Sequence, residues 1–170
     1  MIKGIYSGDK VYSSSSEAFS LYEKSKLGEK IKDKIEYSFV EVLYLVEGKK
    51  MEVLFGNKMM DYDDLIRKIR KKDKGIELKY RVYADLRSKG YIVKTALKFG
   101  ADFRVYEKGF RPGESHAKWI VYATYENSGL KWNEFAAKNR VAHSTKKKLL
   151  LGIVDEEGDV SYYEVDWARM

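Results

Sequence analysis

Residues 100–125 read GADFRVYEKGFRPGESHAKWIVYATY and contain the features on which both the fold and the site depend. Apolar residues dominate 102–106 and again 117–125, a composition typical of buried strands. Between them, a polar run carries two glycines and the only proline of the chain, which predicts an exposed loop. Tyr106 therefore closes one strand and His116 opens the next, so two proton-transfer groups are expected at the same end of a sheet.

Further along the chain, residues 143–155 read HSTKKKLLLGIVD and place lysines at the start of another apolar strand. A tyrosine, a histidine and a lysine at strand ends would form a proton-transfer site that needs no metal ligands. Each has an ordinary alternative, because such a tyrosine usually packs, a histidine can cap a strand, and a lysine run is usually solvated. The local sequence does not choose among Lys146, Lys147 and Lys148.

The composition favours a polyanionic partner. The 170 residues include 33 Lys and Arg against 26 Asp and Glu, a net charge of +7. A Lys/Glu-rich surface without cysteine also suits proteins from hot environments. Because cysteine is absent, disulfides, thiolate zinc sites and cysteine nucleophiles are excluded. No signal peptide or long apolar run is found, so we expect a soluble, cytoplasmic chain without a membrane segment.

The amino-terminal part is predicted to mix short strands with helices. The expected elements are two short strands over 1–12, a helix that begins in the serines 13–16 with Ser14 and Glu17 at capping-box spacing and runs to Gly28, a helix over 33–47, a strand over 51–55 and a helix over 61–72. The basic run at 67–75 is either a nucleic-acid patch or a solvated helix end followed by a linker, and we prefer the linker.

After this linker the pattern changes to a helix followed mainly by strands. The expected elements are a helix over 76–88, strands over 91–100, 101–106 and 117–126, a helix over 132–140, and strands over 148–155 and 160–167 joined by the turn EEGD. We therefore predict an α+β amino-terminal domain over residues 1–74. An α/β catalytic domain over 75–170, with a mixed β-sheet flanked by helices, is predicted to follow.

Three segments resemble the archaeal tRNA-intron (splicing) endonuclease family: GYIVKTALKFGADFRVYEKG at 90–109, His116, and RVAHSTKKKLLLGIVDEEGDVSYYEV at 140–165. The resemblance is specific over 80–167 and looser over the amino-terminal part, where the family has a small α/β domain. It implies a catalytic tyrosine, histidine and lysine at Tyr106, His116 and Lys147, with the lysine assigned by family spacing. No cofactor and no metal are implied.

The same resemblance implies how RNA is held and cut. Arg140 and Trp167 would clamp a bulged base, whereas His143, expected in a turn formed by VAHS, is interpreted as structural or secondary. The substrate would be precursor tRNA, cut at bulge-helix-bulge junctions by attack of the RNA's own 2′-OH. Such cleavage gives a 2′,3′-cyclic phosphate and a 5′-hydroxyl. Two-metal chemistry would need clustered carboxylates aimed at one point, and restriction-type nucleases need a Pro-Asp start followed by an acid-x-Lys element. The only proline, Pro112, precedes Gly113, so that motif is absent.

The resemblance further implies a homotetramer, the assembly expected for family chains of about this length. An acidic turn would enter a positive groove of a neighbouring subunit, and the strand VSYYEVDW would supply an apolar edge for a tighter dimer contact. The acidic residues are Asp155, Glu156, Glu157 and Asp159. Two alternatives are a catalytically idle, basic structural subunit and a general RNA-binding protein. Idle subunits of the family lack the three catalytic residues, which this chain keeps.

Overall fold

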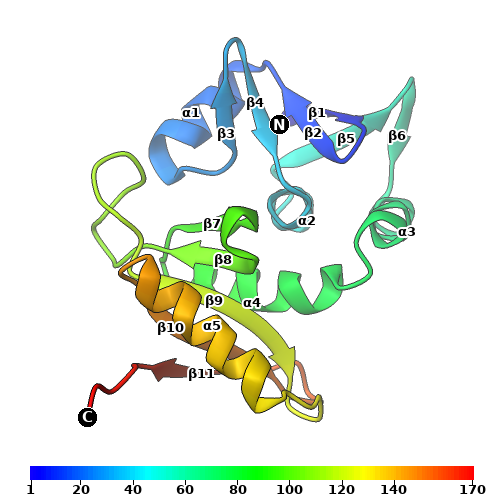
Figure 1. Cartoon of the computed structure of the whole chain (residues 1–170). Coiled ribbons are helices and arrows are strands. Elements are labelled where there is room, and N and C mark those ends of the chain that lie inside the picture. The colour runs from blue at the N-terminus through cyan, green and yellow to red at the C-terminus, as the bar shows by residue number, and fades with distance from the viewer. The chain divides into compact units, whose positions relative to one another are not determined.

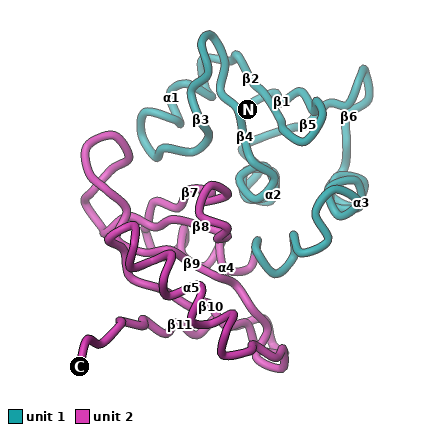
Figure 2. Tube along the Cα trace, viewed as in Figure 1, with its two compact units in different colours: residues 1–80 teal, residues 81–170 magenta.

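The computed structural model describes all 170 residues, which form two compact units, residues 1–80 and 81–170 (Figures 1 and 2). Each unit combines a mixed sheet with helices, in agreement with the predicted fold class. The division falls inside helix α4 (Ile76–Ser88), whereas the boundary expected from the sequence lies between residues 74 and 75. No helix combines the length and the apolar character needed to cross a membrane.

The first unit is built on a six-stranded sheet in the order β3-β4-β2-β1-β5-β6. Only the β1–β5 pair is parallel. The strands are β1 (Ile2–Ser7), β2 (Lys10–Ser13), β3 (Glu29–Ile31), β4 (Lys34–Tyr37), β5 (Met51–Phe55) and β6 (Lys58–Met60). The helices are α1 (Ser16–Ser25), α2 (Phe39–Glu47) and α3 (Tyr62–Lys72). Strand β6 is not among the elements predicted from the sequence.

The helix predicted over 33–47 is wrong in its first third, because the strands β3 and β4 form a hairpin there. Lys32 adopts a left-handed backbone conformation with φ of 55° and turns the chain between the strands. In β4 the buried residues alternate, Ile35 and Tyr37, and this period of two belongs to a strand. The helical period begins only after Ser38, the N-cap of α2.

The start of α1 also differs from the prediction by one residue. Its N-cap is Ser15, whose hydroxyl accepts a hydrogen bond from the Ala18 backbone N–H at 3.2 Å, and not Ser14. Four consecutive serines offer the same capping chemistry at each position, so the sequence alone does not select among them. The predicted helices over 61–72 and 76–88 are confirmed by α3 and α4.

One buried carboxylate, that of Glu41, connects three parts of the first unit. It accepts hydrogen bonds from the Gly28 backbone N–H at 2.9 Å, the Ser38 backbone N–H at 2.9 Å and the Ser38 hydroxyl at 2.8 Å. Gly28 has φ of 83°, and a Cβ there would lie 2.3 Å from the side chain of Ile35. Both the backbone conformation and the close packing therefore require glycine at this point.

The second unit is built on a five-stranded sheet in the order β11-β10-β9-β8-β7. Its elements are β7 (Val93–Ala96), the short 3₁₀ helix η1 (Leu97–Phe99), β8 (Ala101–Val105), β9 (Trp119–Tyr125), α5 (Trp132–Ser144), β10 (Lys148–Val154) and β11 (Val160–Val165). Helix α5 covers one face of β9 and β10 (Figure 1), where Ala142 packs with the fully buried Ile120 and Leu149.

A hydrogen bond ties α4 to the edge strand of this sheet. The Tyr162 hydroxyl on β11 donates to the Asp85 carboxylate on α4 at 2.6 Å. Burial and this hydrogen bond raise the pKa of Tyr162 above its ordinary value. Beside it, a Cβ at Gly152 would lie 3.0 Å from Val82, so β10 and α4 approach closely because residue 152 has no side chain.

We predict that Glu41→Ala destabilises the protein. The substitution leaves the Gly28 and Ser38 donors without their charged acceptor, and hydrogen bonds to charged groups each contribute about 1.5–3 kcal/mol. Two of the three bonds are only partly buried, so water can replace the carboxylate there, and we expect the free energy of unfolding to fall by about 2–4 kcal/mol, less than their sum, in a denaturant titration. The control Glu23→Ala removes an exposed carboxylate and should leave the midpoint unchanged. Equal midpoints for the two variants would contradict this role of Glu41.

Candidate active site

The strand directions bring three chain segments to one edge of the second sheet. Strand β9 pairs antiparallel with β8 and parallel with β10. The carboxyl end of β8 therefore lies beside the amino ends of β9 and β10. Lys148, the first residue of β10, lies opposite Trp119, the first residue of β9, and its N–H donates to the Lys118 carbonyl at 2.9 Å. Residues just outside these three strand ends must meet.

A hollow of about 400 Å³ lies at this edge, and it brings Tyr106, His116 and Lys147 together. It is lined by Phe99, Arg104, Tyr106, Gly113, Glu114, Ser115, His116, Ala117 and Lys147. The tyrosine and the histidine are expected at a common sheet end, and they do lie there. Phe99 and Arg104 are not expected from the sequence, although Arg104 precedes Tyr106 by two residues, the spacing that repeats along one face of a strand.

Tyr106 is held rigidly from its backbone. Its N–H donates to the Ile92 carbonyl at 3.1 Å, which extends the β7–β8 pairing by one residue beyond the strand. Only 6% of Tyr106 is exposed, so the surrounding residues restrict its ring.

His116 is exposed and lies at the end of the loop between β8 and β9. The loop turns at Arg111, whose carbonyl accepts from the Ser115 N–H at 3.0 Å and the Ser115 hydroxyl at 3.2 Å. Immediately after His116, Ala117 is buried and the Lys118 N–H donates to the Val105 carbonyl at 2.9 Å. The backbone of His116 thus lies between a hydrogen-bonded turn and the first hydrogen bond of the β8–β9 pair, and both fix its position.

The three consecutive lysines have different surroundings. Lys146 has φ of 58° and ends α5, and its N–H donates to the His143 carbonyl at 3.0 Å. Lys147 lines the hollow, with its Nζ donating to the Thr145 carbonyl at 3.2 Å and lying 5.7 Å from the centre of the Phe99 ring. The left-handed residue reverses the chain between helix and strand, and so it directs neighbouring side chains apart.

The Lys148 side chain pairs with two acids, one on β11 and one just after it. Its Nζ pairs with Asp166 at 3.0 Å and with Glu164 at 3.3 Å, and these hydrogen bonds raise the pKa of Lys148. The structure therefore separates three residues that the sequence leaves equivalent. Of the three, only Lys147 lines the hollow.

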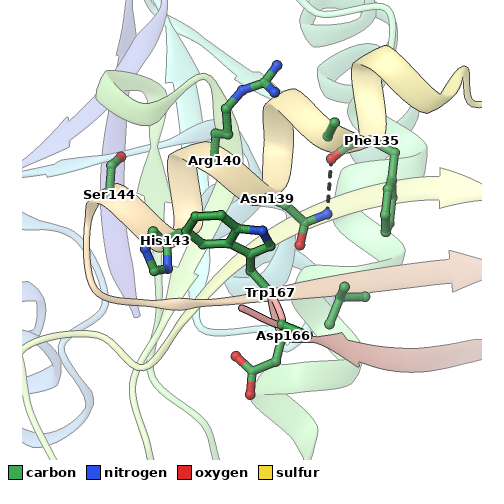
Figure 3. Close-up of a pocket in the computed structure, with 10 residues that line it drawn as sticks. Phe135, Asn139, Arg140, His143, Ser144, Asp166 and Trp167 are labelled. Atoms are coloured by element: carbon green, nitrogen blue, oxygen red, sulfur yellow. Dashed lines mark hydrogen bonds between the residues drawn. The ribbon is translucent and has the colours of Figure 1, made fainter. Parts of the chain in front are cut away.

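Arg140 and Trp167, expected to hold a base, line a second hollow of about 550 Å³ between α5 and the segment after β11. Figure 3 shows Arg140 and His143 on α5, with the Trp167 indole beside the His143 ring. The two rings meet edge to face with centres 4.3 Å apart. Close by, the Asn139 side-chain amide donates to the Phe135 carbonyl at 3.1 Å (Figure 3). Trp167 is 61% exposed, so its ring is accessible.

The expectation that His143 lies in a turn is wrong. Helix α5 continues to Ser144, beyond the predicted end at 140, and His143 lies exposed in its last turn. The sequence VAHS lacks the glycine or proline that usually ends a helix. The termination depends on Lys146, whose left-handed conformation has no sequence signature because lysine rarely adopts it.

The acidic residues form the turn between β10 and β11, as predicted. The Asp155 carboxylate accepts hydrogen bonds from the Glu157 N–H at 2.9 Å and the Asp159 N–H at 3.0 Å, so it shapes the turn itself. Glu156, Glu157 and Asp159 are all exposed at the surface of the turn. A Cβ at Gly158 would lie 3.2 Å from the guanidinium of Arg81, a cation close to the turn.

The first hollow brings together groups that move protons and groups that hold anions. A phenol and an imidazole exchange protons, while an ammonium and a guanidinium stabilise negative charge that develops in a transition state. No group of three or more His, Cys, Asp or Glu side chains lies close enough together to hold a metal ion.

Comparison with known proteins assigns both units to one family. Residues 2–66 match the model described as tRNA intron endonuclease, N-terminal domain, and residues 76–162 match tRNA intron endonuclease, catalytic C-terminal domain. The chain is 42% identical over 170 residues to the tRNA-splicing endonuclease of Thermococcus gammatolerans, covering 99% of each. It is 42% identical over 164 residues to that of Pyrococcus horikoshii, with 96% and 94% covered. For that of Methanothermobacter thermautotrophicus the identity is 38% over 164 residues, with 95% of each covered.

Proposed function

The chain belongs to the tRNA intron endonuclease family, and on this premise we propose that it cuts precursor tRNA at both exon–intron junctions of a bulge-helix-bulge. The cut strand supplies its own nucleophile, the 2′-OH beside the scissile phosphate. Its attack expels the 5′-oxygen and leaves a 2′,3′-cyclic phosphate and a 5′-hydroxyl. Neither a water nucleophile nor a metal ion is required by this chemistry, so the protein must only move two protons and stabilise charge.

Three side chains divide these tasks. His116 donates the proton to the departing 5′-oxygen, because imidazole is the side chain suited to proton transfer near neutral pH. Tyr106 either takes the 2′-OH proton or orients that hydroxyl for attack. Lys147 supplies positive charge to the phosphoryl oxygens. What supports these roles is that the three side chains line one hollow of about 400 Å³.

Arg140 and Trp167 hold a base that is unstacked in the bulge. Proteins read structured RNA chiefly by shape and by stacking splayed-out bases on aromatic rings or guanidinium planes. The exposed Trp167 ring and the Arg140 guanidinium line one apolar hollow, which suits such a base. The alternative of an idle, basic RNA-binding subunit is disfavoured, because the catalytic domain of the family is present and Tyr106, His116 and Lys147 share one hollow.

The decisive test is cleavage of a bulge-helix-bulge RNA in excess EDTA. We expect full activity, with products that carry a 2′,3′-cyclic phosphate and a 5′-hydroxyl. A control RNA with 2′-deoxyribose at each cleavage site should bind and remain intact, because it lacks the nucleophile. A 5′-phosphate product, or activity that EDTA abolishes and magnesium restores, would show that the mechanism is wrong.

The run of lysines offers a matched pair of variants. Lys147→Ala should slow the single-turnover rate by about 10²–10³-fold, the usual loss when one stabilising donor is removed. Lys148→Ala removes the same charge one residue later, from a group held by Asp166 and Glu164, and should reduce the rate far less. Rapid-quench kinetics at saturating enzyme separates the chemical step from binding. If Lys148→Ala is the slower variant, the assignment of Lys147 is wrong.

We further propose that the protein is a homotetramer in which the acidic turn of one copy enters a positive groove of another. A precursor tRNA intron has two junctions, so a symmetric assembly with paired sites matches the substrate. The acids of this turn stand on a chain whose net charge is +7, so opposite charge is available for them on a second copy. The edge strand β11, with Tyr163 58% exposed, is the candidate surface for the tighter dimer contact.

The assembly test replaces Glu156, Glu157 and Asp159 by lysine in one variant, which reverses their charge. Asp155 is retained, because its carboxylate accepts the hydrogen bonds that shape the turn. Light scattering should give four times 19.8 kDa for the wild type and half that mass for the variant, with little cleavage. Exposed charge pairs are screened by salt, so the wild type should also dissociate more readily as salt rises. The control reverses three other exposed acids, Glu23, Asp33 and Glu126, and should remain tetrameric. A wild-type monomer, or a tetrameric turn variant, would contradict the proposal.

A further inference from the structure

Arg104 carries a buried donor that the protein itself does not satisfy. The residue lies on β8 and lines the same hollow as Tyr106, His116 and Lys147. Its Nε is inaccessible to solvent and has no hydrogen-bond acceptor. Most buried polar groups in proteins are hydrogen-bonded, so each exception calls for an explanation. A guanidinium stays charged at any physiological pH and cannot lower this cost by losing a proton.

The neighbours of Arg104 on the sheet do not supply an acceptor. Opposite it stand Lys94 on β7 and Ile120 on β9, a second cation and an apolar side chain that are both buried. Asp102, two residues earlier on the same face of β8, has a carboxylate that accepts from the Ala123 N–H at 2.7 Å. The only acid that lines the hollow is Glu114, which is exposed and forms no ion pair with Arg104. The protein thus gives the Arg104 Nε no acceptor, and because the residue as a whole is only partly buried and lines the hollow, its guanidinium can meet an anion that enters from outside.

We propose that the Arg104 guanidinium binds the nonbridging oxygens of the scissile phosphate and stabilises their charge as the fifth bond to phosphorus forms. The inference rests on the proposed function, since it concerns the same phosphodiester. It adds to that function a fourth residue that touches the reacting group. No covalent step passes through Arg104, which neither gains nor loses a proton.

The chemistry of the guanidinium fits this role better than any other group in the hollow. Its planar fork of N–H donors matches two oxygens of a phosphate, whereas an ammonium acts as a point charge. Lys147 already directs its Nζ to the Thr145 carbonyl, which leaves it less able to serve both oxygens. Because Arg104 stands two residues before Tyr106, whose N–H continues the β7–β8 pairing one residue past the strand, the two side chains lie on the same face, about 6–7 Å apart along the chain. This spacing allows one to act on the 2′-OH and the other on the adjacent phosphate.

The test combines Arg104→Gln and Arg104→Lys with phosphorothioate substrates. A bulge-helix-bulge RNA is prepared with sulfur replacing one or the other nonbridging oxygen at the cleavage site. Each is cleaved under single-turnover conditions in EDTA. With the all-oxygen RNA, we expect Arg104→Gln to be slower by about 10²–10³-fold, with Arg104→Lys between it and the wild type. Affinity for the uncleavable 2′-deoxy RNA should change little.

The sulfur effect separates contact with the phosphate from a structural role. In the wild type the two sulfur isomers should differ in rate, and this difference should shrink in Arg104→Gln because the contact that sulfur weakens is already gone. A misplaced sheet edge would slow both isomers equally. The control Lys131→Gln removes one exposed positive charge at the start of α5 and should keep the wild-type ratio.

Three outcomes would overturn the inference. If the wild type cleaves and the isomer ratio is the same in wild type and Arg104→Gln, Arg104 does not touch the reacting oxygens. If both Arg104 variants lose their thermal unfolding transition, the Arg104 side chain is a structural requirement and the inference is wrong. If the wild type itself leaves the RNA intact, the proposed function fails first and the inference falls with it.

Discussion

The parallel pairing of β9 with β10 is the constraint on which the second unit depends. Parallel neighbours cannot be joined by a tight turn, so the chain must cross the sheet between them, and helix α5 forms this crossover. The register, with Lys148 opposite Trp119, places the end of the crossover beside the loop that carries His116. Antiparallel β8 brings Tyr106 to the same edge. Residues distant in the chain thus meet because of strand direction alone.

The crossover helix serves both hollows. Its last turns carry Arg140 and His143 to the apolar hollow beside Trp167, and the left-handed Lys146 that follows it turns Lys147 into the hollow of Tyr106. A base held against α5 and a phosphate held at its end would then be positioned by one rigid element. Catalysis that depends on orientation benefits from such rigidity, since small displacements of the reacting groups cost much of the rate.

The cation at the start of β10 is paired with acids, whereas the cations of the hollow that holds Tyr106 are not. Lys148 pairs with Glu164 and Asp166, and Glu164 also accepts from the Trp119 indole N–H at 2.7 Å, a hydrogen bond that lowers the pKa of Glu164. These interactions neutralise one cation next to the strand edge. The hollow itself has two cations, Lys147 and Arg104, against one acid, Glu114, so its net charge is positive. In the proposed function, the phosphate of the RNA supplies the missing negative charge.

The sequence by itself determined the strand-loop-strand segment around residues 100–125, helices α3 and α4, and the meeting of Tyr106 with His116, because alternation and helical periodicity are local signals. Only the tertiary structure distinguished Lys147 from Lys146 and Lys148. The left-handed backbone at Lys146 directs neighbouring side chains apart, and β11 brings carboxylates to Lys148 but leaves Lys147 in the hollow. Tertiary structure was also needed to identify the β3–β4 hairpin. Its strands are so short that their sequence pattern does not outweigh the helical pattern of the residues that follow. The burial of the Arg104 Nε likewise arises only when β7 and β9 close around β8. A residue's own sequence neighbours specify its face of a strand, but not what covers that face.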